Sequence, residues 1–354
     1  MNSKDTFSDI YPQSLTRLPT YKCNAACEQC CFESNPQIKH KASLESIKNN
    51  LESAKKAFPS LKLIVFSGGE VFLLKDKLFD AIKHARHLGF QVRCVTNAFW
   101  AKTKKNSDHI SNLLAEADIS EINISTGADH QKFVPFESVE NACESLTAAN
   151  IPTLVTVEAD ADSTKCLDQA KESQIFRTIF ETRPHLFSLQ SNSWMPFHEG
   201  YEERGTACGL DNINDGCTQV FNNIVITPYG RLAACCGLTF EHIPEMTLGE
   251  INETHDNLSE LFSVGYNDFI KIWIHVDGPG VILKKIFGND IPEDLKNVRH
   301  ICQACAFLHL NPSARDQLKR KYIEFVPEVV ARFTLKTKLL ADEGKISSRN
   351  FSKC

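Results

Sequence analysis

The sequence predicts an α/β fold built around a parallel β-sheet. Between residues 15 and 190, short apolar runs alternate with longer segments whose apolar residues recur three or four positions apart. The short runs are typical of strands and the longer segments of amphipathic helices, so the alternation indicates parallel strands joined by helical crossovers. The chain has 354 residues, 42% hydrophobic and 23% charged, which is enough to bury one large core or two domains.

Six strands are expected in this region, with a helix after each of the first five. The strands are the runs at 15–23, 61–66, 90–95, 119–125, 153–158 and 185–190. Helical spacing occurs at 43–57, 74–88, 107–117, 134–149 and 163–173. Ser43 is a suitable N-cap for the first helix, because its hydroxyl can accept a hydrogen bond from a free N–H group of the first turn.

The alternation stops near residue 201, and a different organisation begins there. Residues 221–235 predict a β-hairpin with a turn at Pro228-Tyr229-Gly230, and residues 317–340 predict a closing helix. We therefore expect an N-terminal arm (1–14), a parallel-sheet domain (15–200), a small second domain (201–310) and a C-terminal helix with its tail (311–354).

Three cysteines follow the first predicted strand at the spacing Cys-x3-Cys-x2-Cys. They are Cys23, Cys27 and Cys30, and three thiolates on one short loop suggest a metal site. Iron–sulfur clusters are usually held by four thiolates, so a set of three would leave one iron open to another ligand. A structural zinc site completed by Cys31 or a distant residue, and buried unreactive cysteines, are the alternatives.

This cysteine spacing resembles the cluster motif of radical S-adenosylmethionine (radical SAM) enzymes. The resemblance implies a partial (βα)6 TIM-like barrel over residues 15–200 and a 4Fe–4S cluster whose open iron binds S-adenosylmethionine. It also implies reductive cleavage of that cofactor to a 5′-deoxyadenosyl radical, which abstracts hydrogen from a substrate. Many members of the family carry an aromatic residue just before the third cysteine, where this chain has Gln29.

Further polar residues at predicted strand ends fit the same family. Gly68, Gly69 and Glu70 directly follow the second strand, and the resemblance implies that this segment binds the methionyl ammonium group. Asn97 and Ser125 end the next two strands, where family members contact the ribose and carboxylate of the cofactor. We expect Asp129 and His130 to form a turn, while Glu158, Gln190 and Asn192 would point into the barrel mouth.

A second group of cysteines occurs after residue 201. Twelve residues separate Cys217 from Gly230 and four separate Gly230 from Cys235, and Cys302 and Cys305 form a later Cys-x2-Cys pair. The pattern resembles the auxiliary-cluster domains named SPASM and twitch. Because only Cys354 follows, the resemblance favours the twitch form, with one auxiliary 4Fe–4S cluster on these four cysteines. A zinc ribbon is the alternative.

Composition and charge disfavour two classes of binding partner, nucleic acids and membranes. The net charge is −5 and no basic tract interleaved with aromatic residues occurs, so nucleic acid is disfavoured. No apolar run approaches the roughly 20 residues of a membrane span, and no signal-peptide core is present, so we expect no membrane partner and a cytoplasmic location. Fourteen cysteines in such a chain favour metal or redox use over disulfides.

The resemblance favours a peptide-modifying enzyme that carries out oxidation or crosslinking with an external electron donor. Only 22 residues precede Cys23, so we expect that recognition of a peptide leader needs a separate partner or the C-terminal insert at residues 256–293. Epimerisation or dehydrogenation of a peptide, sugar or aminocyclitol is the alternative, and Cys236 would then be a hydrogen donor to the substrate radical. A non-enzymatic iron–sulfur or zinc scaffold is the remaining hypothesis.

Overall fold

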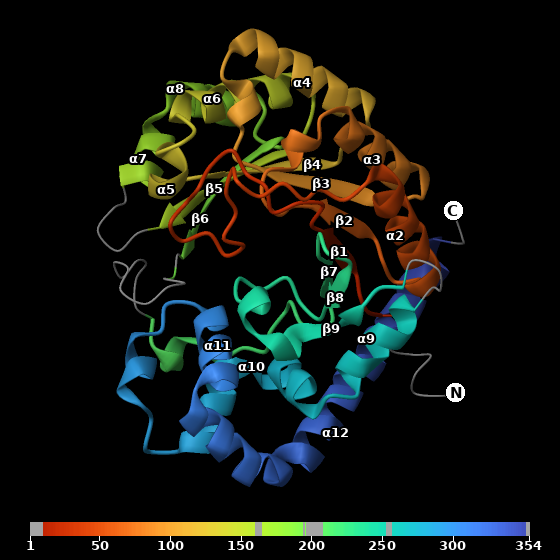
Figure 1. The fold of residues 1–354 in the computed structure, drawn as a ribbon, viewed down its shortest axis with the longest axis vertical. Coiled ribbons are helices and arrows are strands. Elements are labelled where there is room, and N and C mark those ends of the chain that lie inside the picture. Colours follow the sequence, from red (N-terminus) through yellow and green to blue (C-terminus); the bar gives the residue numbers. More distant parts are fainter. Residues whose placement is uncertain (1–9, 160–164, 194, 196–207, 253–256, 352–354) are drawn as a thin grey trace.

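The computed structural model describes residues 10–159, 165–193, 195, 208–252 and 257–351. Its centre is an open sheet whose first six strands lie side by side in chain order, each parallel to the next (Figure 1). They are β1 (Ser14–Arg17), β2 (Leu63–Phe66), β3 (Gln91–Thr96), β4 (Glu121–Thr126), β5 (Thr153–Ala159) and β6 (Phe187–Ser193). The predicted α/β fold with a partial barrel is confirmed.

Helices cover one face of this sheet and form the outer wall of the partial barrel (Figure 1). They are α2 (Leu44–Ala57), α3 (Asp76–His87), α4 (Lys104–Glu116), α6 (Phe136–Ala148), α7 (Lys165–Glu172) and α8 (Gln174–Thr182). The Ser43 hydroxyl accepts a hydrogen bond from Ser46 N at 3.0 Å, which confirms the predicted N-cap. The sequence pattern did not predict α8 as a separate helix.

Side-chain alternation along the strands separates the core from the barrel interior. Leu15, Ile64, Ile122 and Val155 are fully buried. Because successive strand residues point to opposite faces, residues of the other parity face the interior, and these include Val95, Ser125 and Thr156.

The first strand is shorter than predicted, since β1 ends at Arg17 and not at Cys23. Pro19 follows two residues later and has no N–H group to donate to a neighbouring strand. The chain leaves the sheet there and runs towards the cysteine loop, so residues 18–22 form a connection between the strand and that loop.

The predicted hairpin is confirmed, and it extends the barrel sheet. Strands β7 (Asn223–Ile226) and β8 (Arg231–Ala233) pair antiparallel, and β9 (Thr247–Glu250) pairs with β8. On its other side β7 pairs parallel with β1, so one nine-stranded sheet runs through both halves of the chain. The domain boundary near residue 200 stays a prediction, because residues 196–207 lie outside the described chain.

Four helices complete the C-terminal part and pack together beside β7–β9 (Figure 1). They are α9 (Leu258–Tyr266), α10 (Phe269–Phe287), α11 (Ile301–Leu310) and α12 (Pro312–Phe351). The last of these contains the predicted helix at 317–340 and extends beyond it at both ends. None of the helices in the described ranges has the length and apolar character to cross a bilayer.

Candidate active site

A cavity of about 280 Å³ opens where the carboxyl ends of the barrel strands meet the cysteine loop. Its wall contains every residue that the sequence placed around the cluster and its cofactor: Cys23, Cys27, Cys30, Gly68, Gly69, Glu70, Asn97 and Ser125. Cys236 and Leu238, from the segment after β8, close it from the C-terminal half. The fold therefore brings these predicted residues together, although they are spread over more than two hundred positions.

The three thiols of the cysteine loop lie at the wall of this cavity and are partly or fully shielded from solvent. Burial, together with the nearby Glu70 carboxylate, raises the pKa of Cys23 to about 12, and burial and Glu158 also raise the pKa of Cys27. Thiols must lose their protons to bind a metal. Because burial and the nearby carboxylates disfavour the thiolate form here, a bound cation would have to supply the positive charge that stabilises it. Soft sulfur donors of this kind suit iron–sulfur clusters or zinc.

The two glycines after β2 allow two backbone segments to touch. Gly69 N donates to Thr20 O and Glu70 N donates to Lys22 O, both at 2.8 Å. A Cβ atom at Gly69 would lie 2.2 Å from Lys22 O, and Gly68 has φ of +126°. Only glycine fits such a close approach. The glycines therefore hold the chain that leads into Cys23.

The Glu70 carboxylate accepts hydrogen bonds from other groups of the protein. It is 1% exposed and accepts hydrogen bonds from Phe72 N and Asn97 N at 2.9 Å and from the Thr96 hydroxyl at 3.0 Å. Burial raises its pKa to about 7 despite these hydrogen bonds. Glu70 thus fixes the end of β3 against the turn after β2.

A polar network beside the cysteine loop was not predicted from the sequence. Asp129 is fully buried and accepts hydrogen bonds from Gln29 N at 3.3 Å and from Lys132 Nζ at 3.0 Å. Asp129 N donates to Glu158 Oε2 at 3.2 Å, and Glu158 Oε1 contacts His130 Nδ1. Burial opposes charge on His130, but the Glu158 carboxylate raises the pKa of its imidazole.

The expected turn at Asp129 and His130 is the short helix α5 (Ala128–Gln131). His130 and Glu158 line the cavity, and Asp129 binds the backbone between Cys27 and Cys30. Their position after strands β4 and β5 is the sequence signal that could have identified them as a group. Of the other two strand-end residues, Asn192 also lines the cavity, whereas Gln190 donates to the Thr156 hydroxyl.

The four later cysteines line a second, much smaller cavity of about 20 Å³. Cys217, Cys235, Cys302 and Cys305 all face it, together with apolar residues such as Ile274. Burial raises the pKa of Cys302 to about 12 and also raises the pKa values of Cys235 and Cys305. The hairpin and α11 thus bring these four thiols together.

The remaining cysteines lie in different places. Cys31 and Cys236 line the larger cavity, whereas the Cys208 thiol donates to Val298 O at 3.1 Å. Cys354 is outside the described residues. Within the described ranges, no three His, Cys, Asp or Glu side chains converge in the way that a single metal ion would require.

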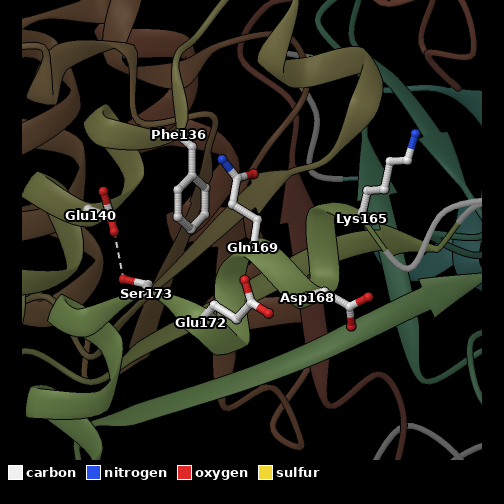
Figure 2. Close-up of a pocket in the computed structure, with 7 residues that line it drawn as sticks. All are labelled: Phe136, Glu140, Lys165, Asp168, Gln169, Glu172 and Ser173. Carbon is white, nitrogen blue, oxygen red and sulfur yellow. Dashed lines mark hydrogen bonds between the residues drawn. The ribbon is translucent and has the colours of Figure 1, made fainter.

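A larger open groove of about 570 Å³ lies on the outer wall and shares no lining residue with the two cysteine-lined cavities. Figure 2 shows its seven lining residues, which come from α6, α7 and the start of α8. The Ser173 hydroxyl donates to Glu140 at 2.6 Å and caps the N-terminus of α8. None of the predicted site residues lies in this groove.

Comparison with known proteins finds a family match over a part of the chain that lines the larger cavity. Residues 18–159 match the family described as the radical SAM superfamily. "Putative peptide biosynthesis protein YydG" of Bacillus subtilis (strain 168) is 30% identical over 124 residues, which cover 35% of this chain and 38% of that protein. The aligned region thus spans well under half of this curated relative.

Two solved structures share the fold. Native anSMEcpe with bound AdoMet and Cp18Cys peptide is 15% identical with a TM-score of 0.54, and the match covers 87% of this chain and 99% of that one. Streptococcus suis SuiB bound to precursor peptide SuiA is 14% identical with a TM-score of 0.52, over 83% and 76% of the two chains. The family match includes the cysteine loop, residues 68–70, Asn97 and Ser125, so the part of the chain that supplies these residues to the larger cavity is similar to the radical SAM superfamily.

Proposed function

We propose that this enzyme binds a 4Fe–4S cluster through Cys23, Cys27 and Cys30 and uses S-adenosylmethionine to start radical chemistry on a peptide. The observation that carries the proposal is the shared cavity, which joins three thiols to the glycine turn and to polar strand ends inside the region that is similar to the radical SAM superfamily. When bound, the cluster supplies the electron that cleaves S-adenosylmethionine to a 5′-deoxyadenosyl radical.

The residues around the cavity fit this group and have separate tasks. The three thiols release their protons to the solvent when they become iron ligands. The turn at Gly68 and Gly69 keeps their loop against the sheet, and Ser125 offers a hydroxyl to the cofactor from β4. The segment with Cys236 and Leu238 restricts the entry of water from the C-terminal side.

A peptide is the substrate class that the comparisons support best. The curated relative is described as a putative peptide biosynthesis protein, and the two structures compared above each contain a bound peptide. Oxidation or crosslinking of a ribosomal peptide is therefore our favoured reaction. The proposal includes an external electron donor, and it leaves peptide-leader recognition to a separate protein or to the C-terminal insert at residues 256–293.

An auxiliary 4Fe–4S cluster on Cys217, Cys235, Cys302 and Cys305 forms the second part of the proposal. Its support is that four buried or half-buried thiols line one small cavity. A cluster with four protein ligands has no open iron. Its task would be to carry an electron between the substrate and the external donor.

One observation favours epimerisation as a second candidate reaction. Cys236 lines the cavity from the segment after β8, where its S–H group can meet a substrate radical. In that step the S–H bond breaks, a C–H bond forms on the substrate, and a thiyl radical remains on Cys236. One electron from the external donor and one proton from solvent then restore the thiol.

The experiment that tests the main proposal is measurement of 5′-deoxyadenosine after anaerobic cluster reconstitution and reduction. We expect each of Cys23→Ala, Cys27→Ala and Cys30→Ala to abolish it, because two thiolates cannot hold the cluster. Cys235→Ala and Cys302→Ala should lower the iron content but leave some cleavage. Cys166→Ala, on the outer helix α7, is the matched control.

Two results would contradict the proposal. Continued formation of 5′-deoxyadenosine by a variant that lacks all three loop cysteines would exclude the cluster assignment. Zinc bound at the second cysteine set, with no iron lost from Cys235→Ala, would show a structural zinc domain in place of the auxiliary cluster.

A further inference from the structure

Asn97 lies between the end of β3 and the cysteine loop and is 6% exposed. Its side-chain Nδ2 is 3.7 Å from Cys23 Sγ and 3.1 Å from Asn24 Oδ1. Its Oδ1 accepts a hydrogen bond from Phe99 N at 3.1 Å. The amide therefore bridges β3 to the first cysteine of the loop.

The orientation of this amide follows from its partners. A backbone N–H group can only donate, so the Asn97 oxygen must face Phe99 N. The NH2 group then faces Cys23 and Asn24, and each of its two hydrogens has an acceptor. The sulfur of Cys23 also accepts a bond from Ala25 N at 3.4 Å, so two N–H groups point at it.

The backbone of Asn97 is fixed from the other side by Glu70. Glu70 Oε2 accepts a hydrogen bond from Asn97 N at 2.9 Å, and both carboxylate oxygens contact the Thr96 hydroxyl. Trp100 Nε1 donates to the same hydroxyl at 3.2 Å. The position of the amide relative to Cys23 is thus set by buried groups on three segments.

We propose that Asn97 is a positioning residue that raises the reduction potential of the cluster through its hydrogen bond to the Cys23 sulfur. Hydrogen bonds to cluster sulfurs and the surroundings of the ligands set the potentials of iron–sulfur centres. An N–H group next to a thiolate stabilises negative charge, and the reduced cluster is the more negative state. Asn97 therefore favours the reduced state that cleaves S-adenosylmethionine.

This role differs from the one that the sequence predicted for Asn97, which was contact with S-adenosylmethionine. Both hydrogens of its NH2 group are already used within the protein, so contact through them would break one of these bonds. The inference rests on the proposed function, since it requires an iron–sulfur cluster at Cys23.

The test compares the reconstituted wild type with Asn97→Ala and Asn97→Ser in the absence of S-adenosylmethionine. The serine hydroxyl can still accept a hydrogen bond from Phe99 N, but it is too short to reach Cys23. At one fixed solution potential near the wild-type midpoint, EPR gives the ratio of reduced to oxidised cluster. We expect that ratio to fall several-fold in both variants, with unchanged iron per chain.

Asn141→Ala is the matched control. The Asn141 amide donates to Ala101 O at 3.2 Å and so supports the same region after β3 without contacting Cys23. The control should keep the wild-type ratio. A fall in the control equal to that in the Asn97 variants would make the effect structural and overturn the proposal.

Other results decide between the remaining explanations. An unchanged ratio combined with weaker binding of S-adenosylmethionine would assign Asn97 to the cofactor and overturn the proposal. Loss of iron from both Asn97 variants, with normal thermal unfolding, would make the residue necessary for assembly and also overturn it. If the wild type itself assembles no cluster, the proposed function fails, which is a separate outcome.

Discussion

Cys235 and Cys236 are neighbours in sequence, yet they line different cavities. They come shortly after β8, in a connection without regular secondary structure. Cys235 lines the cavity of the second cysteine set, while Cys236 lines the larger cavity beside the cysteine loop. The Cys236 thiol is thus next in sequence to a proposed ligand of the auxiliary cluster, yet it lines the cavity of the other proposed cluster.

The role of Cys236 can be tested with deuterated water once a substrate is known. Epimerisation predicts a product with one new deuterium, because the thiol hydrogen exchanges with solvent before it is transferred. Cys236→Ala should remove this label while formation of 5′-deoxyadenosine continues. A product that is two hydrogens lighter, and equally abundant in the variant, would exclude the donor role and support oxidation.

His275 is another buried residue whose chemistry depends on its partners. It is 3% exposed, and its Nδ1 lies 3.1 Å from Val220 O, which can only accept a hydrogen bond. Nδ1 therefore carries the proton, and Nε2 accepts from the Tyr11 hydroxyl at 3.3 Å. Burial, helped by the positive charge of Lys336, lowers the pKa of His275 to about 4.

This lowered pKa predicts a loss of stability in acid. In the unfolded chain His275 takes up a proton near its ordinary pKa of 6.5, whereas in the folded state it stays neutral down to about 4. The contribution of His275 to stability therefore falls as the pH falls through this window, by about 2 kcal/mol between about pH 7 and pH 5, while the raised pKa of Glu70 acts in the opposite direction. Urea unfolding at both values should show a smaller loss for His275→Gln. An equal loss in the variant would contradict the assignment.

At the scale of elements, an ion-pair cluster fastens the last helix, α12, to α10. Asp277 on α10 is 6% exposed and accepts two hydrogen bonds from Arg332 on α12, at 2.6 and 2.9 Å. Lys285 and Trp273 donate to the same carboxylate at 3.0 and 2.9 Å. Burial opposes ionisation, but these donors hold the pKa of Asp277 below its ordinary value.

We expect Asp277→Ala to destabilise the protein by about 1–3 kcal/mol, because it leaves the buried Trp273 N–H group without its acceptor. Hydrogen exchange should also become faster in α12. Asp277→Asn keeps an oxygen for Trp273 and should cost less. Glu328→Ala removes only an exposed partner of Arg332 and should change stability by less than about 1 kcal/mol. Equal effects of Asp277→Ala and Glu328→Ala would contradict this account.

At the scale of the whole molecule, β1 is the strand that joins the two halves. It pairs with β2 on one side and with β7 on the other. Arg17 in β1 is 1% exposed, and its guanidinium donates to Ile226 O, at the end of β7, and to Thr227 O just after it. The barrel therefore obtains part of its sheet, and a partner for a buried charge, from the C-terminal half.

A fragment that ends at residue 200 should consequently aggregate. Without β7, strand β1 has an unpaired edge, and exposed strand edges pair with other chains. Size-exclusion chromatography and circular dichroism would measure this. A full chain cut at a protease site inserted within 196–207 is the control, and its two pieces should stay associated. A folded, monomeric 1–200 fragment would show that the hairpin is dispensable.

Local patterns in the sequence were sufficient for the six barrel strands and the hairpin, because each depends on residues close together in the chain. The sequence also predicted that site residues at the strand ends would lie near one another, since parallel strands end at the same edge of a sheet. The pairing of β1 with β7 could not be predicted, because 209 residues separate Arg17 from Ile226. The bond from Gln29 N to Asp129 joins positions 100 residues apart and was missed for the same reason.

Strand β7 is synthesised long after β1, and this order affects the growing chain. Ribosomes add about 5–20 residues per second, so Ile226 is made about 10–40 s after Arg17. During this interval β1 can pair with β2, but its other edge has no partner from its own chain. A growing chain that reaches residue 200 thus resembles the aggregation-prone fragment, and the synthesis of β7 removes that hazard.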